Sequence, residues 1–402
     1  MDSKPSVVMV GLGYIGLPTA ALIASKGLQV TGVDIHQNVV DTINRGEIHI
    51  VEPDLDGLVH HVVKEKYLKA TTSPVAADVY LIAVPTPFKG DHEPDITYVE
   101  SATRAILPTL NEGCLVIIES TSPVGTTEKM QKVIFDERPE LMGKISMAYC
   151  PERVLPGNVI HELEHNDRAI GGIDEASTEK AIWFYRHFVK GALHKTNAKT
   201  AEMCKLVENS SRDVQIAFAN ELSMICDKAG INVWELIDLA NKHPRVNILQ
   251  PGTGVGGHCI AVDPWFIVSE FPEESKIIRA AREINNFKTE WVIEKVKNAA
   301  LQFKLDNGRE AKISCMGLAF KPNIDDLRES PALYVAESLV HHGHEVIAVE
   351  PNIEGHNSFD MRSIENGKEE GDIIVFLVAH SEFKNTEIPT DKIVMDFCNV
   401  IN

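Results

Sequence analysis

Positive charge is scarce in this chain of 402 residues, where 39 Lys and Arg face 58 Asp and Glu and the formal net charge is −19. Such an acidic chain repels phosphate backbones and anionic lipid, which argues against nucleic-acid partners and membrane surfaces. Long apolar runs are also lacking. The longest, Val79–Val84 and Ile373–Ala379, fall far short of the roughly 18 residues of a spanning helix.

Cysteine is rare too, with seven residues and no Cys-x-x-Cys pair. An odd number of scattered cysteines favours a reducing compartment over a disulfide framework or a structural zinc site. The first residues, Met1–Pro5, contain no apolar stretch typical of a signal peptide. We therefore expect a cytoplasmic protein. A solvated helix end explains His341, His342 and His344 better than a metal site, so no metal is predicted.

The first 150 residues alternate short runs rich in Val and Ile with helical patterns. Strands that are covered on both faces carry few charges, and their alternation with helices predicts an α/β fold with a doubly wound parallel sheet. The predicted strands of this sheet are Val7–Val10, Gln29–Asp34, Val79–Val84 and Leu115–Glu119.

The centre of the chain is predicted to be helical, and strands return near the C-terminal end. Thr200 and Gly230 fit the N-cap and the end of the longest helix. The pattern predicts an N-terminal α/β domain over 1–199, a helical segment over 200–304 and a smaller α/β domain over 305–402. The later elements are predicted at Ala201–Lys228, Ile231–Lys242, Glu274–Gln302, Lys312–Met316, Pro331–His342, Glu345–Val349 and Asp372–Val378.

A glycine motif, Gly11-Leu-Gly13-Tyr-Ile-Gly16, follows the first predicted strand and opens the helix Leu17–Ser25. Gly11 permits the tight turn, Gly13 lets a pyrophosphate approach the backbone, and Gly16 lets helix and strand pack closely. Asp34 lies 18 residues after Gly16, at the end of the second strand. This combination predicts a dinucleotide site in which Asp34 binds the adenosine ribose, which favours NAD over NADP.

A second glycine-rich stretch, Pro251–Gly257, lies just before Cys259, and Asp263 follows four residues later. Glycines lose much backbone entropy on folding, so a run of them indicates that a ligand or another backbone approaches closely. Cys259 is therefore a candidate nucleophile at the end of a ligand-binding loop. A buried, unreactive thiol is the alternative, and it is how we interpret the other six cysteines.

The long central helix carries Lys205, Asn209 and Arg212, whose spacing places all three on one face. They are candidate substrate or catalytic residues, and a solvated polar stripe is the alternative interpretation. Glu152 follows a probable strand end and adds a carboxylate, which would otherwise be a surface charge.

These segments together resemble the nucleotide-sugar 6-dehydrogenase family, which includes UDP-glucose and GDP-mannose dehydrogenases. The matching pieces occur in the family's order over nearly the whole chain. They are GLGYIGLP from Gly11, PTP from Pro85, ESTSPVGTT from Glu119, CPERVLPG from Cys150, AEMCKLVENSSRDV from Ala201, PGTGVGGHCIAVDPWF from Pro251 and GLAFKPNIDDLRESP from Gly317.

The resemblance implies a cytoplasmic enzyme with a Rossmann-like NAD-binding domain, central helices that form a homodimer, and a Rossmann-like UDP-binding domain. The segments from Asn44, Asn241 and Gly256 point to the branch that oxidises UDP-N-acetyl-D-mannosamine, with two NAD⁺, to the uronate used in bacterial surface polysaccharide. In the family, the residue matching Arg245 reaches into the neighbouring subunit, so the active sites are shared.

The resemblance also implies residue roles. Cys259 matches the nucleophile that forms a thiohemiacetal and then a thioester, and Lys205 matches the acid/base lysine. The other catalytic matches are Asn209, Asp263, Glu152 and Thr121. The cofactor matches, besides the three glycines and Asp34, are Tyr14, Ile15, Thr86, Thr127 and Arg328. The substrate matches are Arg153, Val154, Lys205, Asn209, Arg212, His243, Arg245, Gly256, Lys321 and Pro322.

One departure concerns the end of the chain, where the family usually places a basic residue near the nucleotide. From Met395 onward this chain has no Lys or Arg. Three other functions compete with the main prediction. They are a sister enzyme for UDP-N-acetylglucosamine or UDP-glucose, a non-catalytic protein that binds NAD or UDP-sugar, and a two-electron hydroxyacid-type dehydrogenase. The binding protein would need neither Cys259 nor Lys205, and the two-electron dehydrogenase would not need Cys259.

The placement of Asp34 predicts strong discrimination between the two nicotinamide cofactors. A 2′-phosphate about 4 Å from this carboxylate would be repelled by roughly 4 kcal/mol per charge pair at an effective dielectric constant near 20. Steady-state kinetics should therefore give a kcat/KM for NADP⁺ several hundredfold or more below that for NAD⁺. Values within about tenfold of each other would show that Asp34 does not face the ribose.

Overall fold

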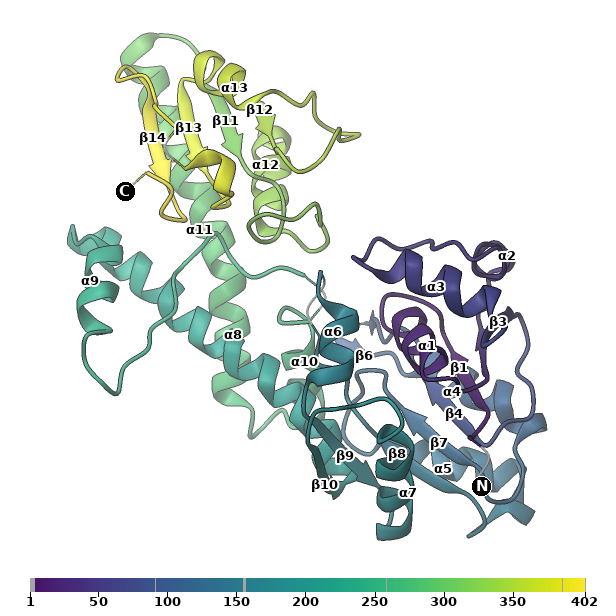
Figure 1. Ribbon diagram of the computed structural model, residues 1–402. Helices are drawn as coiled ribbons and strands as arrows, with labels where there is room; N and C mark the ends of the chain where they lie inside the picture. Colours follow the sequence, from purple (N-terminus) through teal and green to yellow (C-terminus); the bar gives the residue numbers. More distant parts are fainter. Residues whose placement is uncertain (1–3, 91, 155–156, 258, 385, 402) are drawn as a thin grey trace. The chain divides into compact units, whose positions relative to one another are not determined.

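The computed structural model describes residues 4–401, except 91, 155–156, 258 and 385, and divides the chain into two compact units, Met1–Val207 and Glu208–Asn402. The first unit contains an eight-stranded sheet in the order β10-β9-β8-β7-β4-β1-β2-β3 (Figure 1). Its strands are β1 Val7–Val10, β2 Val30–Val33, β3 Leu68–Thr71, β4 Val79–Ile82, β7 Leu115–Ile118, β8 Ser146–Tyr149, β9 Arg168–Gly172 and β10 Leu193–Asn197.

The sheet reverses its winding direction between β1 and β4, which pair in parallel. Strands β1 to β3 run to one side of this point and β4, β7 and β8 to the other, which is the doubly wound order. The prediction of a doubly wound sheet is therefore confirmed. Strand β9 pairs antiparallel with β8, and a two-stranded hairpin lies outside the sheet, with β5 at Phe88–Lys89 and β6 at Glu93–Pro94.

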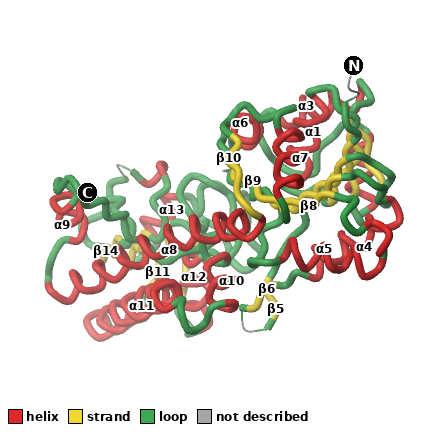
Figure 2. The backbone as a smooth tube through the Cα atoms, turned by 90° about the horizontal axis from the view of Figure 1, so that it is seen from below, coloured by secondary structure: helices red, strands yellow, loops and turns green. Residues whose placement is uncertain are grey.

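Alternate residues of the strands fill the two cores on either side of this sheet. Val7 and Met9 pack with helices α1, α3, α6 and α7, whereas Val8 and Val10 pack with α4 and α5. Figure 2 shows the two helical layers on opposite sides of the strands. The helices are α1 Gly16–Ser25, α2 Gln37–Asn44, α3 Leu55–Lys64, α4 Thr97–Ile106, α5 Thr126–Glu137, α6 Val159–His165 and α7 Glu175–Tyr185, with 3₁₀ turns at Leu107–Thr109 and Pro139–Leu141.

The second unit combines helices with a four-stranded parallel sheet in the order β12-β11-β13-β14. Helices α11 and α12 cover one face of this sheet, and α13 with the C-terminal segment packs on the other. The elements are α9 Val233–Ala240, α10 Asp263–Glu270, α11 Lys276–Asn307, β11 Lys312–Met316, α12 Pro331–His341, β12 Glu345–Val349, α13 Ile364–Glu370, β13 Ile373–Phe376, a 3₁₀ turn Ser381–Phe383 and β14 Ile393–Asp396.

The longest predicted helix exists, but it begins earlier than expected. Helix α8 covers Ala198–Ala229, so Thr200 is inside it rather than at its N-cap. The side chain of Asn197 accepts a hydrogen bond from the amide of Thr200 at 2.9 Å and takes the capping role. Gly230 follows the helix with a φ of +68°, a left-handed conformation that suits glycine after a helix end.

Helices α8 and α11 are joined by buried polar side chains in the second unit. Arg282 donates to Asp213 at 2.6 Å, and the two side chains are 3% and 0% exposed. Asn285 donates to the same carboxylate oxygen at 2.8 Å, and Lys288 donates to Ser223 at 2.7 Å. Burial raises the pKa of Asp213, and Arg282 opposes this shift. The helix pair therefore depends on matched charges rather than on apolar contact alone.

We expect Arg282→Met to destabilise the second unit by roughly 3–5 kcal/mol, because it leaves the Asp213 carboxylate buried without its partner charge. Urea unfolding followed by circular dichroism measures this loss. The double variant Asp213→Leu with Arg282→Met removes both charges and should recover most of the stability. Equal destabilisation in the single and double variants would contradict this account.

Candidate active site

The glycine turn after β1 has the geometry that a dinucleotide requires. Gly11 has a φ of +92°, and a Cβ there would collide with the carbonyl of Ala83. A Cβ on Gly16 would collide with the carbonyl of Gly11. By contrast, a Cβ on Gly13 would meet none of the described atoms within 4 Å. The first and third glycines therefore shape the turn, and the second leaves the backbone at the helix start open to a phosphate group.

Asp34 directly follows β2 and is half-buried beside this turn. Its carboxylate accepts hydrogen bonds from the amides of Leu12 at 3.1 Å and His36 at 3.0 Å. These two bonds orient the carboxylate and leave further acceptor capacity for ribose hydroxyls. The side chain of Tyr14, on the same turn, is 51% exposed. Together these residues fit the adenosine half of a dinucleotide.

The remaining cofactor candidates of the first unit lie in loops and at a helix start. Ile15 and Thr86 are half-buried, the first on the glycine turn and the second after β4. Thr127 is fully buried in the first turn of α5, where its amide and hydroxyl donate to Glu202 at 2.8 and 2.7 Å. The amide of Gly125 donates to the other oxygen of Glu202. The N-terminus of α5 is thus capped by a carboxylate from the chain itself.

Glu152 is buried just after β8 and is held by a guanidinium group. Arg168 donates to it at 2.9 Å, with side-chain exposures of 3% and 7%, and the amide of Arg153 donates to its other oxygen. The same Arg168 nitrogen lies 3.9 Å from the Cys150 sulfur. Burial raises the pKa of the Cys150 thiol to about 11, so it stays protonated at neutral pH. Glu152 is therefore an oriented carboxylate beside an inert thiol.

A second carboxyl group, Glu119, shares this buried cluster. It lies at the end of β7 and accepts a hydrogen bond from Tyr185 at 2.6 Å. Burial raises the pKa of Glu119 to about 7, while Arg168 opposes and Glu152 reinforces the shift. One guanidinium group thus faces two carboxyl groups and directly contacts one of them, Glu152. Thr121 follows Glu119 in the same loop and is half-buried.

Helix α8 positions several of the predicted residues by its spacing. Lys205 and Asn209 are half-buried, and Arg212 is exposed. In the second unit, Asn209 donates to Asp263 at 2.6 Å. The structure therefore brings together two residues that are 54 positions apart and that were both predicted to be catalytic.

Cys259 is exposed and lies in the turn that leads into α10, with three residues between it and the helix. Its carbonyl oxygen accepts the amide of Asp263, the first residue of that helix, at 2.8 Å. Of the seven cysteines, Cys259 is the exposed one, whereas the others are buried or half-buried. Its neighbour His258 lies outside the described residues.

The glycine-rich loop before Cys259 is anchored from both sides within the second unit. The amide of Gly252 donates to Asn220 of α8 at 2.9 Å, and the Thr253 hydroxyl donates to the carbonyl of Leu377 at 2.6 Å. The amide of Gly257 donates to the carbonyl of Arg328 at 3.2 Å. A Cβ on Gly256 would meet Phe320 at 2.8 Å. The loop has glycines because two other loops press against its backbone.

The substrate candidates near these loops are solvent-exposed. Lys321 and Pro322 follow Phe320, and the Lys321 ammonium lies 5.7 Å from the Phe320 ring centroid. Arg328, which was predicted to contact the cofactor rather than the substrate, is also exposed and pairs with Asp326 at 2.6 Å. His243 and Arg245 lie in the exposed connection after α9. Arg153 and Val154 of the first unit are half-buried, and the guanidinium of Arg153 donates to the carbonyl of Asp167.

Several functional-looking residues escaped the sequence analysis. Arg168, Asn220 and His380 lie outside the quoted family segments, and their partners are distant in sequence. Glu202 lies inside the segment from Ala201, but nothing near it in sequence indicates its partner Thr127. Glu119 is the first residue of the family segment ESTSPVGTT. Its position at the end of a predicted strand could have marked it as a site residue.

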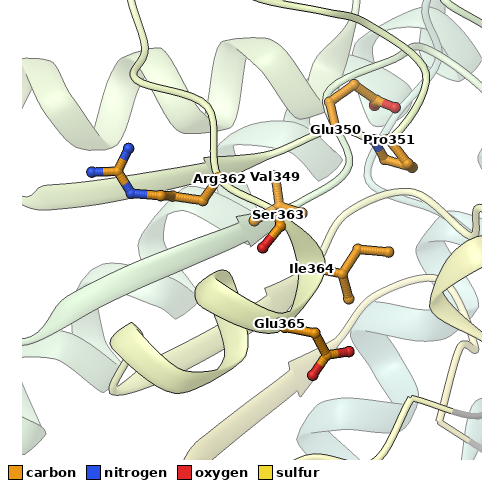
Figure 3. A pocket seen from close by; sticks show the side chains of 7 residues that line it. All are labelled: Val349, Glu350, Pro351, Arg362, Ser363, Ile364 and Glu365. Carbon is orange, nitrogen blue, oxygen red and sulfur yellow. The ribbon is translucent and has the colours of Figure 1, made fainter.

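Among the described residues, no group of three or more His, Cys, Asp or Glu side chains could hold a metal ion. In that part of the chain, no helix is long and apolar enough to cross a membrane. Figure 3 shows an open hollow at the end of β12 and the start of α13, lined by Val349, Glu350, Pro351, Arg362, Ser363, Ile364 and Glu365.

The doubly wound sheet, the open glycine turn and the carboxylate after β2 define the first unit as a dinucleotide-binding domain. The rest of the chain is similar to known proteins as well. The chain belongs to the UDP-glucose/GDP-mannose dehydrogenase family. Residues 5–189 match its NAD binding domain, 199–287 its central domain and 314–402 its UDP binding domain.

Individual relatives are similar over almost the full length. The UDP-N-acetyl-D-mannosamine dehydrogenase of Escherichia coli is 57% identical, covering 95% of both chains. The NDP-N-acetyl-D-galactosaminuronic acid dehydrogenase of Ralstonia nicotianae is 53% identical, covering 96% of this chain and 93% of that one. A solved UDP-D-ManNAc dehydrogenase from Pyrococcus horikoshii has a TM-score of 0.88 and 41% identity, covering 99% of this chain and 96% of that chain.

The raised pKa of Glu119 predicts a pH-dependent stability difference. The folded protein keeps a proton that the unfolded chain releases above pH 4.5, so folding becomes less favourable as the pH rises from 4.5 to about 7. Glu119→Gln removes this dependence. We therefore expect the variant to gain about 3 kcal/mol in unfolding free energy relative to wild type when the pH is raised from about 5 to 8.

Urea unfolding at both pH values measures this shift. Glu65→Gln, at an exposed position after α3, is the matched control and should show a constant difference. A constant difference for Glu119→Gln as well would mean that Glu119 is ionised throughout this pH range in the folded protein.

Proposed function

We propose that this chain catalyses the NAD-dependent, four-electron oxidation of UDP-N-acetyl-D-mannosamine to UDP-N-acetyl-D-mannosaminuronate. One sugar, two NAD⁺ and one water give the uronic acid, two NADH and two protons. The observation that carries this proposal is the exposed Cys259 in the turn before α10, at the end of a glycine-rich loop. The 57% identity to the Escherichia coli enzyme supports the choice of sugar.

The first part of the reaction converts the C6 alcohol to an aldehyde. NAD⁺ would be held at Gly11, Gly13 and Asp34, and it supplies the acceptor for the hydride that leaves C6. Lys205 would take the hydroxyl proton as its neutral amine. Asn209 is held in place by Asp263, and its amide would donate to the oxygen that gains negative charge.

The second part needs Cys259. Its thiolate would add to the aldehyde carbon, and the oxygen would take a proton from Lys205 to give a thiohemiacetal. Return of that proton to Lys205, with transfer of a second hydride from the same carbon to the second NAD⁺, would leave a thioester. Water then attacks the thioester carbon, the C–S bond breaks, and the thiolate returns. Covalent attachment keeps the reactive aldehyde on the enzyme between the two oxidations. Glu152, Asp263 and Thr121 are proposed to hold the attacking water.

The nucleotide part of the substrate is assigned to exposed cations and their neighbours. Lys321 suits the pyrophosphate charge. The further substrate residues that we propose are Pro322, Arg153, Val154, Arg212, His243, Arg245 and Gly256, and the further cofactor residues are Tyr14, Ile15, Gly16, Thr86, Thr127 and Arg328. We propose three functional domains, 1–199, 200–304 and 305–402, in a cytoplasmic homodimer in which Arg245 serves the neighbouring subunit's site.

A second substrate within the same reaction class is favoured by a specific observation. The relative from Ralstonia nicotianae, named for an N-acetylgalactosaminuronic acid, is 53% identical, only slightly less than the mannosamine enzyme. A 2-acetamido sugar is common to both names. Measuring kcat/KM on UDP-N-acetylmannosamine, UDP-N-acetylgalactosamine, UDP-N-acetylglucosamine and UDP-glucose decides among them. A non-catalytic binding protein would turn over none of these sugars.

Cys259→Ser tests the covalent mechanism. A serine hydroxyl is a far weaker nucleophile than a thiolate at neutral pH. The first hydride transfer should survive in part, but full oxidation should fall by orders of magnitude. We expect wild type to form two NADH per sugar without free aldehyde, and the variant to form at most about one. NADH absorbance and chromatography of the products measure both quantities.

The control is Cys398→Ser, at a half-buried cysteine near the C-terminus, which should behave as wild type. Two NADH per sugar at a near-normal rate in Cys259→Ser would rule out covalent catalysis by this residue. One NADH per sugar in wild type would reject the four-electron reaction.

A further inference from the structure

The two units contain glycine turns that are built in the same way. In the first, Gly11 has a φ of +92°, its amide donates to the end of β2 at 2.8 Å, and the next amide donates to Asp34 at 3.1 Å. In the second, Gly317 has a φ of +95°, its amide donates to the end of β12 at 2.8 Å, and the next amide donates to Glu350 at 2.7 Å. Glu350 therefore takes the position that a ribose-binding acid has in the first unit.

Glu350, however, is saturated by donors of its own chain. One carboxylate oxygen accepts from the amides of Leu318 and Ala319 and from the His380 ring, at 2.7, 3.0 and 2.9 Å. The other accepts from the amide of Asn352 at 3.0 Å. The side chains of Glu350 and His380 are both 0% exposed. Burial alone would raise the pKa of Glu350, but these hydrogen bonds outweigh it and lower the pKa to about 2.

The hydrogen bonds also define the protonation of His380. The backbone amide of Asn323 donates to Nδ1 at 3.0 Å, and the Asn352 side chain lies 3.0 Å from the same nitrogen. A backbone N–H is only a donor, so Nδ1 must carry its lone pair and Nε2–H must donate to Glu350. The neutral ring thus links the Glu350 carboxylate to the amide of Asn323.

Asn323 ends the short segment that presents Lys321. Its φ of +61° is left-handed, a conformation that a few short polar residues tolerate. Its side-chain oxygen accepts from the amide and hydroxyl of Ser381 at 2.8 and 3.0 Å. The segment is therefore tied at both ends, to Glu350 through the amides of Leu318 and Ala319 and to His380 at Asn323, while Lys321 between them is exposed.

We propose that His380 is a positioning residue for substrate, which holds the Lys321 segment against buried Glu350 so that Lys321 meets the pyrophosphate of the nucleotide sugar. The inference rests on the proposed function. This proposal also gives a role to the second glycine turn. Glu350 takes the position of a ribose-binding acid, but it anchors the loop that we propose to bind phosphate. His380 reaches substrate only through Asn323 and Lys321.

Two isosteric variants separate the two hydrogen bonds of the ring. His380→Asn places an oxygen near Nδ1 and keeps an acceptor for Asn323, whereas His380→Gln places an amide near Nε2 and keeps the donor to Glu350. We expect His380→Gln to raise the Kd of UDP, and the KM of the UDP-sugar, at least about tenfold. His380→Asn should change both less than about threefold. The kcat at saturating sugar and the KM of NAD⁺ should change little in either variant.

Calorimetry with UDP gives the Kd values, and His342→Gln, at an exposed position after α12, is the matched control. Lys321→Ala tests the route of the effect. In that background His380→Gln should weaken UDP binding no further, because the residue that it positions is gone. Asn323→Gly is a second variant that keeps the left-handed backbone but loses the Ser381 bonds. It leaves the Asn323 amide bonded to His380, so it should weaken UDP binding less than His380→Gln does, and its effect should disappear in the Lys321→Ala background.

Equal losses in His380→Asn and His380→Gln, or additive losses with Lys321→Ala, would overturn the proposal and leave His380 a purely structural residue. Failure of the wild type to bind UDP would instead overturn the proposed function, and this inference with it.

Discussion

A carboxylate that leaves water must be met by donors, and this requirement shapes both units of the chain. Three buried glutamates meet it with backbone amides that are far away in sequence. Glu52 accepts from the amides of Gly157 and Val159 at the start of α6, Glu202 caps α5, and Glu350 holds the turn after β11. Each hydrogen bond links a loop or a helix start to an element distant in sequence, so the loops of the site are restrained by the rest of the fold.

The same requirement extends to the candidate catalytic groups. Glu152 would be an expensive buried charge without Arg168, and Asn209 is oriented by its bond to Asp263. Arg168 lies in β9, Asn209 in α8 and Asp263 in α10, so regular elements hold the partners of the loop residue Glu152 and of the Asn209 amide. Precise placement of reacting groups depends on such support, because small displacements of an acid, base or donor reduce catalysis strongly.

Part of this arrangement was predictable from the sequence. Apolar runs placed strands such as β1 correctly, and the Gly11 turn with Asp34 was found from spacing. The predicted bounds of β1, β11 and β12 match the structure, whereas those of β2, β4, β7 and β13 extend one or two residues past the observed ends. Strand ends depend on which residues find ladder partners, which the sequence pattern does not reveal. The exposure of Cys259 was not predictable, because it depends on which loops pack against one another. The glycine and cysteine content of a segment does not reveal this packing.

The sequence by itself determined the local periodicities, the glycines that a tight turn requires and the order of the family segments, because these depend on residues close together in the chain. It could not determine which partner each buried charge finds. Arg168 with Glu152, Glu202 with Thr127 and His380 with Glu350 are 16, 75 and 30 positions apart. Only the tertiary structure brings such groups within hydrogen-bond distance, since a donor and an acceptor recognise each other over a few ångströms and not along the chain.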